Sequence, residues 1–221
     1  MNVTIFLGNS LYLYITRTKM KRIILAVIFA CSVLTLAAQE GIIVKSRSGK
    51  PTICDFAWAY LSSFNDEDED CNESVNALKQ AWISKRDGIP LEEGETLTID
   101  RKNGFVLYES WHEESLLRIE MCYWNEADKK HKLFACCIGG FFDGKYNPGQ
   151  YDDLVFFRYD NTSKRMVAWE DVGFEVEYSV DGGAYVSYDL PREGKDIVVT
   201  KWYDDGPQRK TLRWNGRRFE D

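Results

Sequence analysis

The chain has 221 residues, 44% of them hydrophobic, and a formal net charge of −7 at pH 7. That hydrophobic content suffices for a buried core and excludes a globally disordered chain. The acidic balance repels phosphate groups, so it argues against nucleic acid and against anionic membrane surfaces as partners.

The first predicted element is an export signal, "MKRIILAVIFACSVLTLAAQEG", at residues 20–41. A lysine–arginine pair precedes a short apolar run that ends in small residues, which is typical of a secretory signal peptide. The run is shorter than the roughly 18 residues of a spanning helix. We therefore expect cleavage after Ala37 or Ala38, a periplasmic or secreted protein, and no stable membrane insertion after cleavage.

Residues 1–19 precede this signal and contain no apolar run of comparable length. The simplest hypothesis is that translation starts at Met20, and a long, unusual leader is the alternative. Cys31 weakly resembles a lipoprotein anchor, but Phe29 stands where a small residue is preferred, and further apolar residues follow Cys31. We therefore expect no lipid anchor and leave residues 1–38 out of the predicted fold.

Residues 39–221 have a length that suits a single domain. We predict an exported α+β domain that is helical over residues 51–88 and β-rich over residues 95–221. In this fold an N-terminal helical hairpin is followed by a mostly antiparallel β-meander, either a sandwich or a half-open barrel. The helices are expected to pack on one face or edge of the sheet.

Two segments with helical spacing predict the hairpin. In "ICDFAWAYLSSF", Phe56, Tyr60 and Phe64 recur every four residues and so lie on one side of a helix. "ESVNALKQAWI" repeats this spacing, and Gly88 and Pro90 follow it as stop signals.

From residue 96 onward the apolar period changes to two, which predicts strands. In "LLRIEMCYW" one face carries Leu117, Ile119, Met121 and Tyr123, and the other, less apolar face carries Arg118, Glu120 and Cys122. Further strands are predicted at "FVLYESW", "DLVFFRY", "MVAWED", "FEVEYSV", "AYVSYDL" and "DIVVTKWY". Near the end of the chain, Asn215–Gly216 predicts a tight hairpin turn.

Three segments resemble one another: "CYWNEADKKHKLFA", "FFRYDNTSKRMVAW" and "KWYDDGPQRKTLRW". Each has an aromatic strand, a polar turn that becomes basic, and an aromatic or apolar return strand. Their unequal spacing does not fit a propeller repeat. We interpret them as ordinary hairpins of an antiparallel meander.

Export would place the remaining cysteines in an oxidising compartment, where disulfides persist. The disulfide candidates are Cys54, Cys71, Cys122, Cys136 and Cys137. Cys54 and Cys71 are expected to tie the two helices together. Cys122 is expected to meet one of the adjacent pair across a turn near residues 128–130, while the other member points into the core as a free thiol. The spacing of these cysteines does not predict a zinc site.

The sequence predicts no catalytic residue, cofactor or metal site. His112 lies at a strand-to-turn boundary, and His131 lies at a charged hairpin tip without a pocket or an orienting partner. A nucleophile motif such as GxSxG does not occur. The acidic run at residues 66–70 lacks the glycine and glutamate that an EF-hand loop needs, so we interpret it as a solvated loop.

The loop "FFDGKYNPGQYDD" at residues 141–153 is the candidate ligand site. Aromatic faces beside carboxylates and amides are the groups that bind sugars. The candidate residues are Asp143, Tyr146, Asn147, Tyr151, Asp152 and Asp153. An ordinary connector that contains glycine and proline is the alternative interpretation.

We therefore expect an exported, non-catalytic binding or interaction module of a bacterial-type cell envelope, with a glycan or another protein as ligand. A carboxylate-dependent, glycosidase-like hydrolase is the alternative, because two carboxylates at a suitable separation suffice for that chemistry. A protein-directed inhibitor fits the same features. A deep pocket with two facing carboxylates would favour the hydrolase, and a shallow aromatic face would favour binding.

Overall fold

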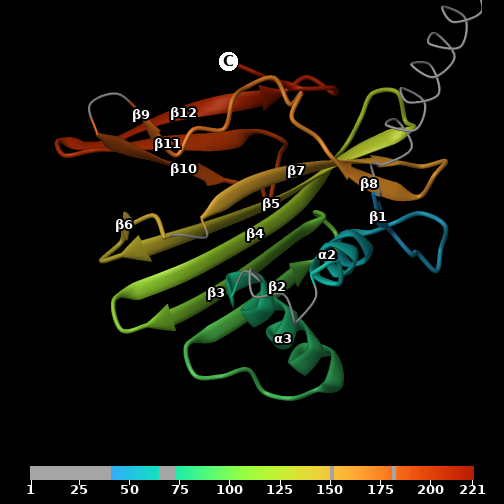
Figure 1. The fold of residues 1–221 in the computed structure, drawn as a ribbon, viewed down its shortest axis with the longest axis horizontal. Coiled ribbons are helices and arrows are strands. Elements are labelled where there is room, and N and C mark those ends of the chain that lie inside the picture. Colours follow the sequence, from blue (N-terminus) through green and yellow to red (C-terminus); the bar gives the residue numbers. More distant parts are fainter. Residues whose placement is uncertain (1–40, 65–72, 150–151, 181–182) are drawn as a thin grey trace, which may run out of the picture. The chain divides into compact units, whose positions relative to one another are not determined.

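A computed structural model of the chain describes residues 41–64, 73–149, 152–180 and 183–221. From residue 41 onward the described chain forms three layers: two helices, a first β-sheet, and a second β-sheet on the far side of the first (Figure 1). The fold is mostly antiparallel β, and both sheets curl like half-barrels. The predicted dominance of antiparallel strands is confirmed.

The first sheet has the strand order β1-β8-β7-β5-β4-β3-β2, and the short β6 pairs with β5. All its pairings are antiparallel. Its strands are β1 (Ile42–Ile43), β2 (Glu95–Asp100), β3 (Phe105–His112), β4 (Ser115–Asn125), β5 (His131–Phe142), β6 (Lys145–Tyr146), β7 (Asp153–Asp160) and β8 (Arg165–Ala168).

The second sheet has the strand order β13-β12-β11-β10-β9 and is also antiparallel. Its strands are β9 (Ser179–Val180), β10 (Ala184–Asp189), β11 (Ile197–Tyr203), β12 (Gly206–Trp214) and β13 (Phe219–Glu220). The three similar segments form the β4–β5, β7–β8 and β11–β12 hairpins. Their interpretation as hairpins of an antiparallel meander is confirmed.

The two predicted helices are α2 (Ile53–Leu61) and α3 (Glu73–Asp87). α2 begins after Thr52, whose backbone N–H donates to the Asp55 carboxylate at 2.8 Å, as in a capping box. α3 ends at Asp87, and Gly88 follows it with a φ of 72°, a left-handed conformation that favours glycine. The residues that connect the helices lie outside the described ranges, so the hairpin itself stays a prediction.

One face of the first sheet packs on the helices. Phe56 of α2 is fully buried, and its ring centroid lies 5.2 Å from that of Tyr123 and 5.1 Å from that of Tyr159. Ile119 and Met121 of β4 are buried on this side, as the alternation of their segment predicts. This core is made almost wholly of apolar and aromatic side chains.

The opposite face of the first sheet packs on the second sheet. Trp124 of β4 contacts Trp214 and Phe219, with ring centroids 5.9 Å and 5.1 Å away. Cys122 is buried in the same core. This face also carries Arg118 and Glu120 and is the less apolar one, as predicted, and the second sheet covers it.

Two local predictions are corrected. Of the predicted strand "FEVEYSV", only Ser179–Val180 forms a strand. The chain before it crosses from the first sheet to the second and bonds to separate partners: Val172 O accepts from Phe219 N, and Tyr178 O accepts from Val186 N. At Asn215–Gly216 the turn spans residues 215–218, because Trp214 pairs with Phe219, and only Gly216 has a positive φ.

Candidate functional site

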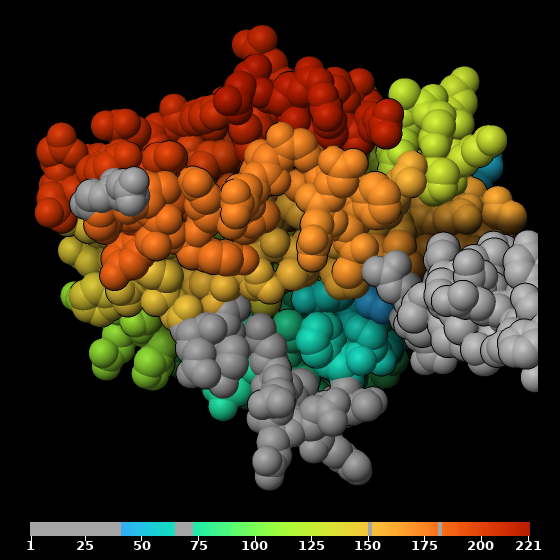
Figure 2. Space-filling model, turned by 45° about the horizontal axis from the view of Figure 1, so that its top comes forward, coloured from blue at the N-terminus to red at the C-terminus, as the bar shows by residue number. Residues whose placement is uncertain are grey.

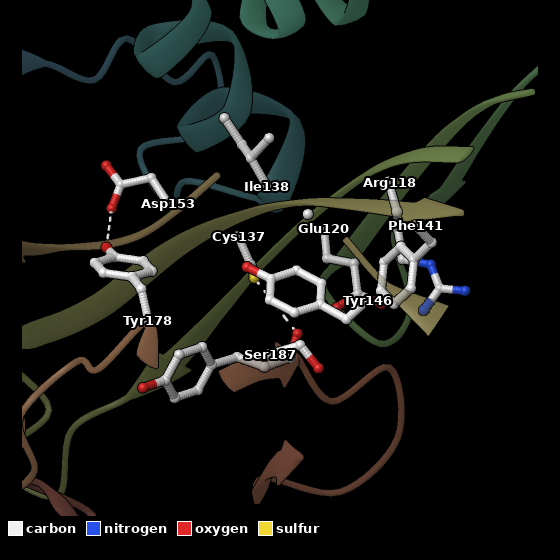
Figure 3. Close-up of a pocket in the computed structure, with 11 residues that line it drawn as sticks. Arg118, Glu120, Cys137, Ile138, Phe141, Tyr146, Asp153, Tyr178 and Ser187 are labelled. Carbon is white, nitrogen blue, oxygen red and sulfur yellow. Dashed lines mark hydrogen bonds between the residues drawn. The ribbon is translucent and has the colours of Figure 1, made fainter. Parts of the chain in front are cut away.

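A narrow cavity lies between the two sheets, at the end of the first sheet that carries the β5–β6 turn (Figure 3). Its volume of about 10 Å³ is close to that of a single water site. It is too small, as the described residues form it, to admit a substrate. Its lining consists of Arg118, Glu120, Cys137, Ile138, Gly139, Phe141, Tyr146, Asp153, Tyr178, Ser187 and Tyr188.

Glu120 is the buried acid of this cavity, with a side chain only 8% exposed. It projects from β4 toward the second sheet, where the backbone N–H of Leu190 donates to its Oε2 at 2.8 Å. Burial raises the pKa of Glu120 to about 7. A carboxyl group with a pKa near neutrality is the type that acts as a general acid or base, provided that a substrate reaches it.

Arg118 lies on the same face of β4, two residues away. Its guanidinium lies 4.9 Å above the ring of Phe141, and the guanidinium group approaches the carboxylates of Glu109 at 3.5 Å and Asp189 at 3.6 Å. Figure 3 draws this cation beside Phe141. Arg118 thus links β3, β4 and β10, and its positive charge also acts on the Glu120 carboxyl.

The predicted ligand loop is only partly available to a ligand. Tyr146 is buried, and Asp152 accepts from the backbone N–H of Gly140 at 2.9 Å. Partial burial raises the pKa of Asp152. Asp143 and Asn147 are exposed at the turn. The carboxylate of Asp152 is therefore engaged with the backbone of the neighbouring strand β5.

Asp153 and Tyr151 are the two other candidate residues of this loop. Asp153 begins β7 and accepts a short hydrogen bond from the hydroxyl of Tyr178, drawn as a dashed line in Figure 3. Burial raises the pKa of Tyr178. Tyr151 lies outside the described residues. The structure brings Tyr146 and Asp153 to the same cavity and leaves Asp143 and Asn147 in solvent.

The predicted disulfide of Cys122 is wrong. The pairing of β4 with β5 is confirmed, but Cys122 lies opposite Ala135, and Cys136 faces the helix side. Cys137 shares the face of Cys122 but is displaced by two residues, a diagonal pair whose Cβ atoms lie too far apart for a disulfide. All three are buried free thiols, and burial raises their pKa values.

The predicted disulfide between Cys54 and Cys71 is not formed either. Cys54 is a partly buried free thiol on α2. Cys71 and the acidic run at residues 66–70 lie outside the described residues.

The imidazole of His131 is held by a neighbouring carboxylate, which its position at a hairpin tip did not predict. Its Nδ1 lies 2.6 Å from a carboxylate oxygen of Asp128, so it does have an orienting partner. Glu126 joins them in a cluster whose potential ligand atoms lie within 4.8 Å of one another. Both oxygens of Glu126 accept from Arg158 at 2.7 Å, so a guanidinium cation already occupies this cluster. His112 is exposed at the end of β3.

A charged cleft of about 400 Å³ opens beside this cluster. The guanidinium of Arg158 lies 4.9 Å above the ring of Trp169, and Arg217 and Arg218 come from the turn before β13. The acids Glu126, Asp171 and Glu220 face the same space. Positive and negative groups are mixed here, so the cleft favours neither an anion nor a cation by its charge.

An apolar groove of about 400 Å³ lies on the other side of Trp169. One wall is four consecutive residues of β7, and the other is the end of β8 with the crossing segment, residues 169–178, which leads to the second sheet. The lining residues are Leu154, Val155, Phe156, Phe157, Ala168, Trp169, Glu170, Val172, Phe174, Glu175 and Val176. The crossing segment lies in the orange part of the chain that separates the first sheet from the red C-terminal strands (Figure 2). The sequence did not predict this groove, because its two walls come from segments that are separate in the chain and that were both predicted to be strands.

The chain matches no protein-family model, no curated protein and no solved structure. Among the described residues, no helix has the length and apolar character needed to cross a membrane.

Proposed function

We propose that residues 39–221 form an exported, non-catalytic binding module of a bacterial-type cell envelope, and that its ligand is another protein. The observation that carries this proposal is the apolar groove between β7 and the crossing segment. It is open to solvent and lined mostly by aliphatic and aromatic side chains, as protein-contact surfaces are. The signal-like residues 20–41 support export to the periplasm or beyond.

A glycan is the less favoured ligand. The aromatic and acidic loop at residues 141–153, which suggested sugar binding, has Tyr146 buried and Asp152 bonded to Gly140. Rings that stack on sugars must present a free face. The groove has mostly aliphatic and aromatic walls, and Glu170 and Glu175 are the only carboxylates among its described lining residues, which is a small set of hydrogen-bonding groups for a ligand rich in hydroxyls.

A carboxylate-dependent hydrolase is the second candidate, and the observation that favours it is the buried carboxyl group of Glu120. Its raised pKa suits a general acid, but the cavity around it has a volume of only about 10 Å³. This candidate therefore requires the two sheets to separate near Glu120. Turnover of a chromogenic glycoside panel that the Glu120→Gln variant loses would establish it.

The binding proposal is tested by capture from an envelope extract and by a glycan array, with the wild-type protein and two variants. Ala168→Arg introduces a long charged side chain at an exposed position of the groove wall. Ile89→Asp is the matched control, because Ile89 is 56% exposed and is not part of the groove lining. We expect the wild type and the Ile89→Asp variant to capture proteins from the extract. The Ala168→Arg variant should not capture them. Glycan binding that survives Ala168→Arg would contradict the proposal.

A further inference from the structure

The two edges of β7 are paired very differently. Its inner edge pairs with β5 along the whole strand, from Asp153 to Asp160. Its outer edge pairs with β8 only from Phe157 to Asp160. The first half of β7 therefore has an outer edge that no strand of the described chain covers, and such an edge is a template for pairing with another chain.

The backbone groups along this half of the edge have few partners in the described chain. Trp169 N–H donates to Phe156 O at 2.9 Å, which is the last backbone bond that prolongs the β7–β8 ladder. Further along, Leu154 N–H points at the hydroxyl of Tyr178 at 3.5 Å. A tyrosine hydroxyl at that distance is a weak substitute for the carbonyl of a neighbouring strand.

The apolar groove runs along this same edge. Its β7 wall consists of Leu154–Phe157, which are four consecutive residues, so the groove follows the backbone edge and not one face of the strand. Its opposite wall includes Phe174 and Val176, which are partly buried. An extended segment placed in the groove would thus meet backbone groups on one side and apolar side chains on the other.

The rim of the groove is acidic. Glu170 and Glu175 line it and are exposed, and residues 169–180 contain four acids and no lysine or arginine. Among the described residues, neither Glu170 nor Glu175 forms an ion pair. The carboxylate of Glu177, by contrast, lies 4.0 Å from the ammonium group of Lys201. Two acidic groups at the mouth of an apolar groove favour a segment in which lysine or arginine accompanies aliphatic residues.

We propose that the outer edge of β7 at Leu154–Phe156 accepts an extended segment of a partner protein as an added strand. Aliphatic side chains of that segment fill the groove, and its basic side chains face Glu170 and Glu175. This inference rests on the proposed binding function and specifies how the partner binds. Main-chain hydrogen bonds provide affinity in this mode, and pockets for alternate side chains provide specificity.

The test uses a blocked nonapeptide of alternating valine and lysine and two N-methylated forms of it, titrated into the purified protein by calorimetry. One form is methylated on the valine amides and the other on the lysine amides. An added strand turns only one set of amides toward β7. We expect one methylated form to bind like the parent peptide and the other to bind at least about tenfold more weakly.

Matched variants sharpen this test. Ala168→Arg should abolish peptide binding, and Glu170→Lys with Glu175→Lys should weaken it at least about tenfold. Tyr178→Phe should strengthen it about threefold, because Leu154 N–H loses its hydroxyl partner. Ile89→Asp should bind as the wild type does. A peptide that alternates valine and glutamate should not bind.

Equal binding of both methylated forms, or no binding of the parent peptide, would overturn the added-strand mode. If envelope proteins were still captured in a manner that depends on Ala168, the proposed binding function would stand without it. If capture also failed, both proposals would fail. A dimer in analytical ultracentrifugation that Ala168→Arg abolishes would identify a second copy of this chain as the occupant and would overturn the partner proposal.

Discussion

The two faces of the first sheet are both buried, but they are buried in different ways. The face toward the helices holds an apolar core in which Phe56 contacts Tyr123, Phe134 and Tyr159. The face toward the second sheet holds a core of similar aromatic content around Trp124 and Phe219, but it also contains the carboxyl group of Glu120. A buried acid is tolerated when hydrogen bonds or protonation compensate for lost hydration.

This difference shows that both faces of one strand can be covered although only one of them has a uniformly apolar sequence pattern. In β4 the helix-side positions are uniformly apolar, while the opposite positions include Arg118 and Glu120. Their polar groups lie between two sheets and are held by Glu109, Asp189 and the backbone of Leu190. The second layer is therefore expected to be the less stable and more pH-dependent of the two.

The largest expected effect is the loss of an aromatic ring from either core. Phe56→Ala should lower the free energy of unfolding by about 3–5 kcal/mol, because Phe56 is fully buried. Phe219→Ala on the other face removes an equally buried ring, but β13 is a two-residue strand near the chain end that can shift to fill the space. Urea unfolding should therefore show the smaller loss for Phe219→Ala. A larger loss there would reverse the ranking of the two layers.

Glu120 should make the stability of the second layer depend on pH. The pKa of its carboxyl is raised to about 7 by burial, whereas the unfolded chain loses this proton near its usual value of 4.5. Between these two values the native state binds more protons, so this contribution to stability is complete below about pH 4.5 and is lost as pH rises through 7. The total is on the order of 3 kcal/mol at most.

Glu120→Gln should remove this dependence, because the amide oxygen still accepts from Leu190 N and carries no charge. The difference in unfolding free energy between variant and wild type should therefore grow in favour of the variant from pH 4.5 to 8. Glu113→Gln, at an exposed turn, is the control and should show no such trend. A flat difference for Glu120→Gln would mean that Glu120 is hydrated in solution.

A smaller effect is expected at the tip of the β4–β5 hairpin, where Glu126 is 6% exposed and accepts two hydrogen bonds from Arg158. Glu126→Gln removes the negative charge and one of the two oxygen atoms that accept hydrogen bonds from Arg158. It should lower the unfolding free energy by about 1–3 kcal/mol. Asp143→Asn, at the exposed β5–β6 turn, should change it by less than about 0.5 kcal/mol. Thermal or urea unfolding of both variants decides the point.

The smallest expected difference concerns the buried thiols, and it compares the two layers directly. Cys136 faces the helices, and Cys122 and Cys137 face the second sheet. If the second layer opens without the first, Cys122 and Cys137 should react with a thiol reagent about tenfold faster than Cys136 in the native protein. Mass spectrometry of the labelled peptides measures the ratio. Equal rates for all three would show that the layers open together.

Local sequence pattern determined most of the secondary structure of this protein. Alternation over "LLRIEMCYW" gave the correct faces of β4, and helical spacing located α2 and α3, because period and capping are properties of short segments. The turn between β4 and β5 was also found in the expected place. A strand was predicted over residues 174–180, where alternation is present, but only Ser179–Val180 forms one, by pairing with β10.

Only the tertiary structure decided what covers each face and where a ligand can bind. The polar residues Arg118 and Glu120 favour a solvent-exposed face when their own segment is considered alone. Glu120 is nevertheless buried and Arg118 partly covered, because the second sheet with β10, which lies far along the chain, packs on this face. The groove likewise needs β7 and the crossing segment to lie side by side while leaving a strand edge uncovered. Burial and edge exposure depend on contacts between distant segments, and the hydrophobic period of a single segment does not predict those contacts.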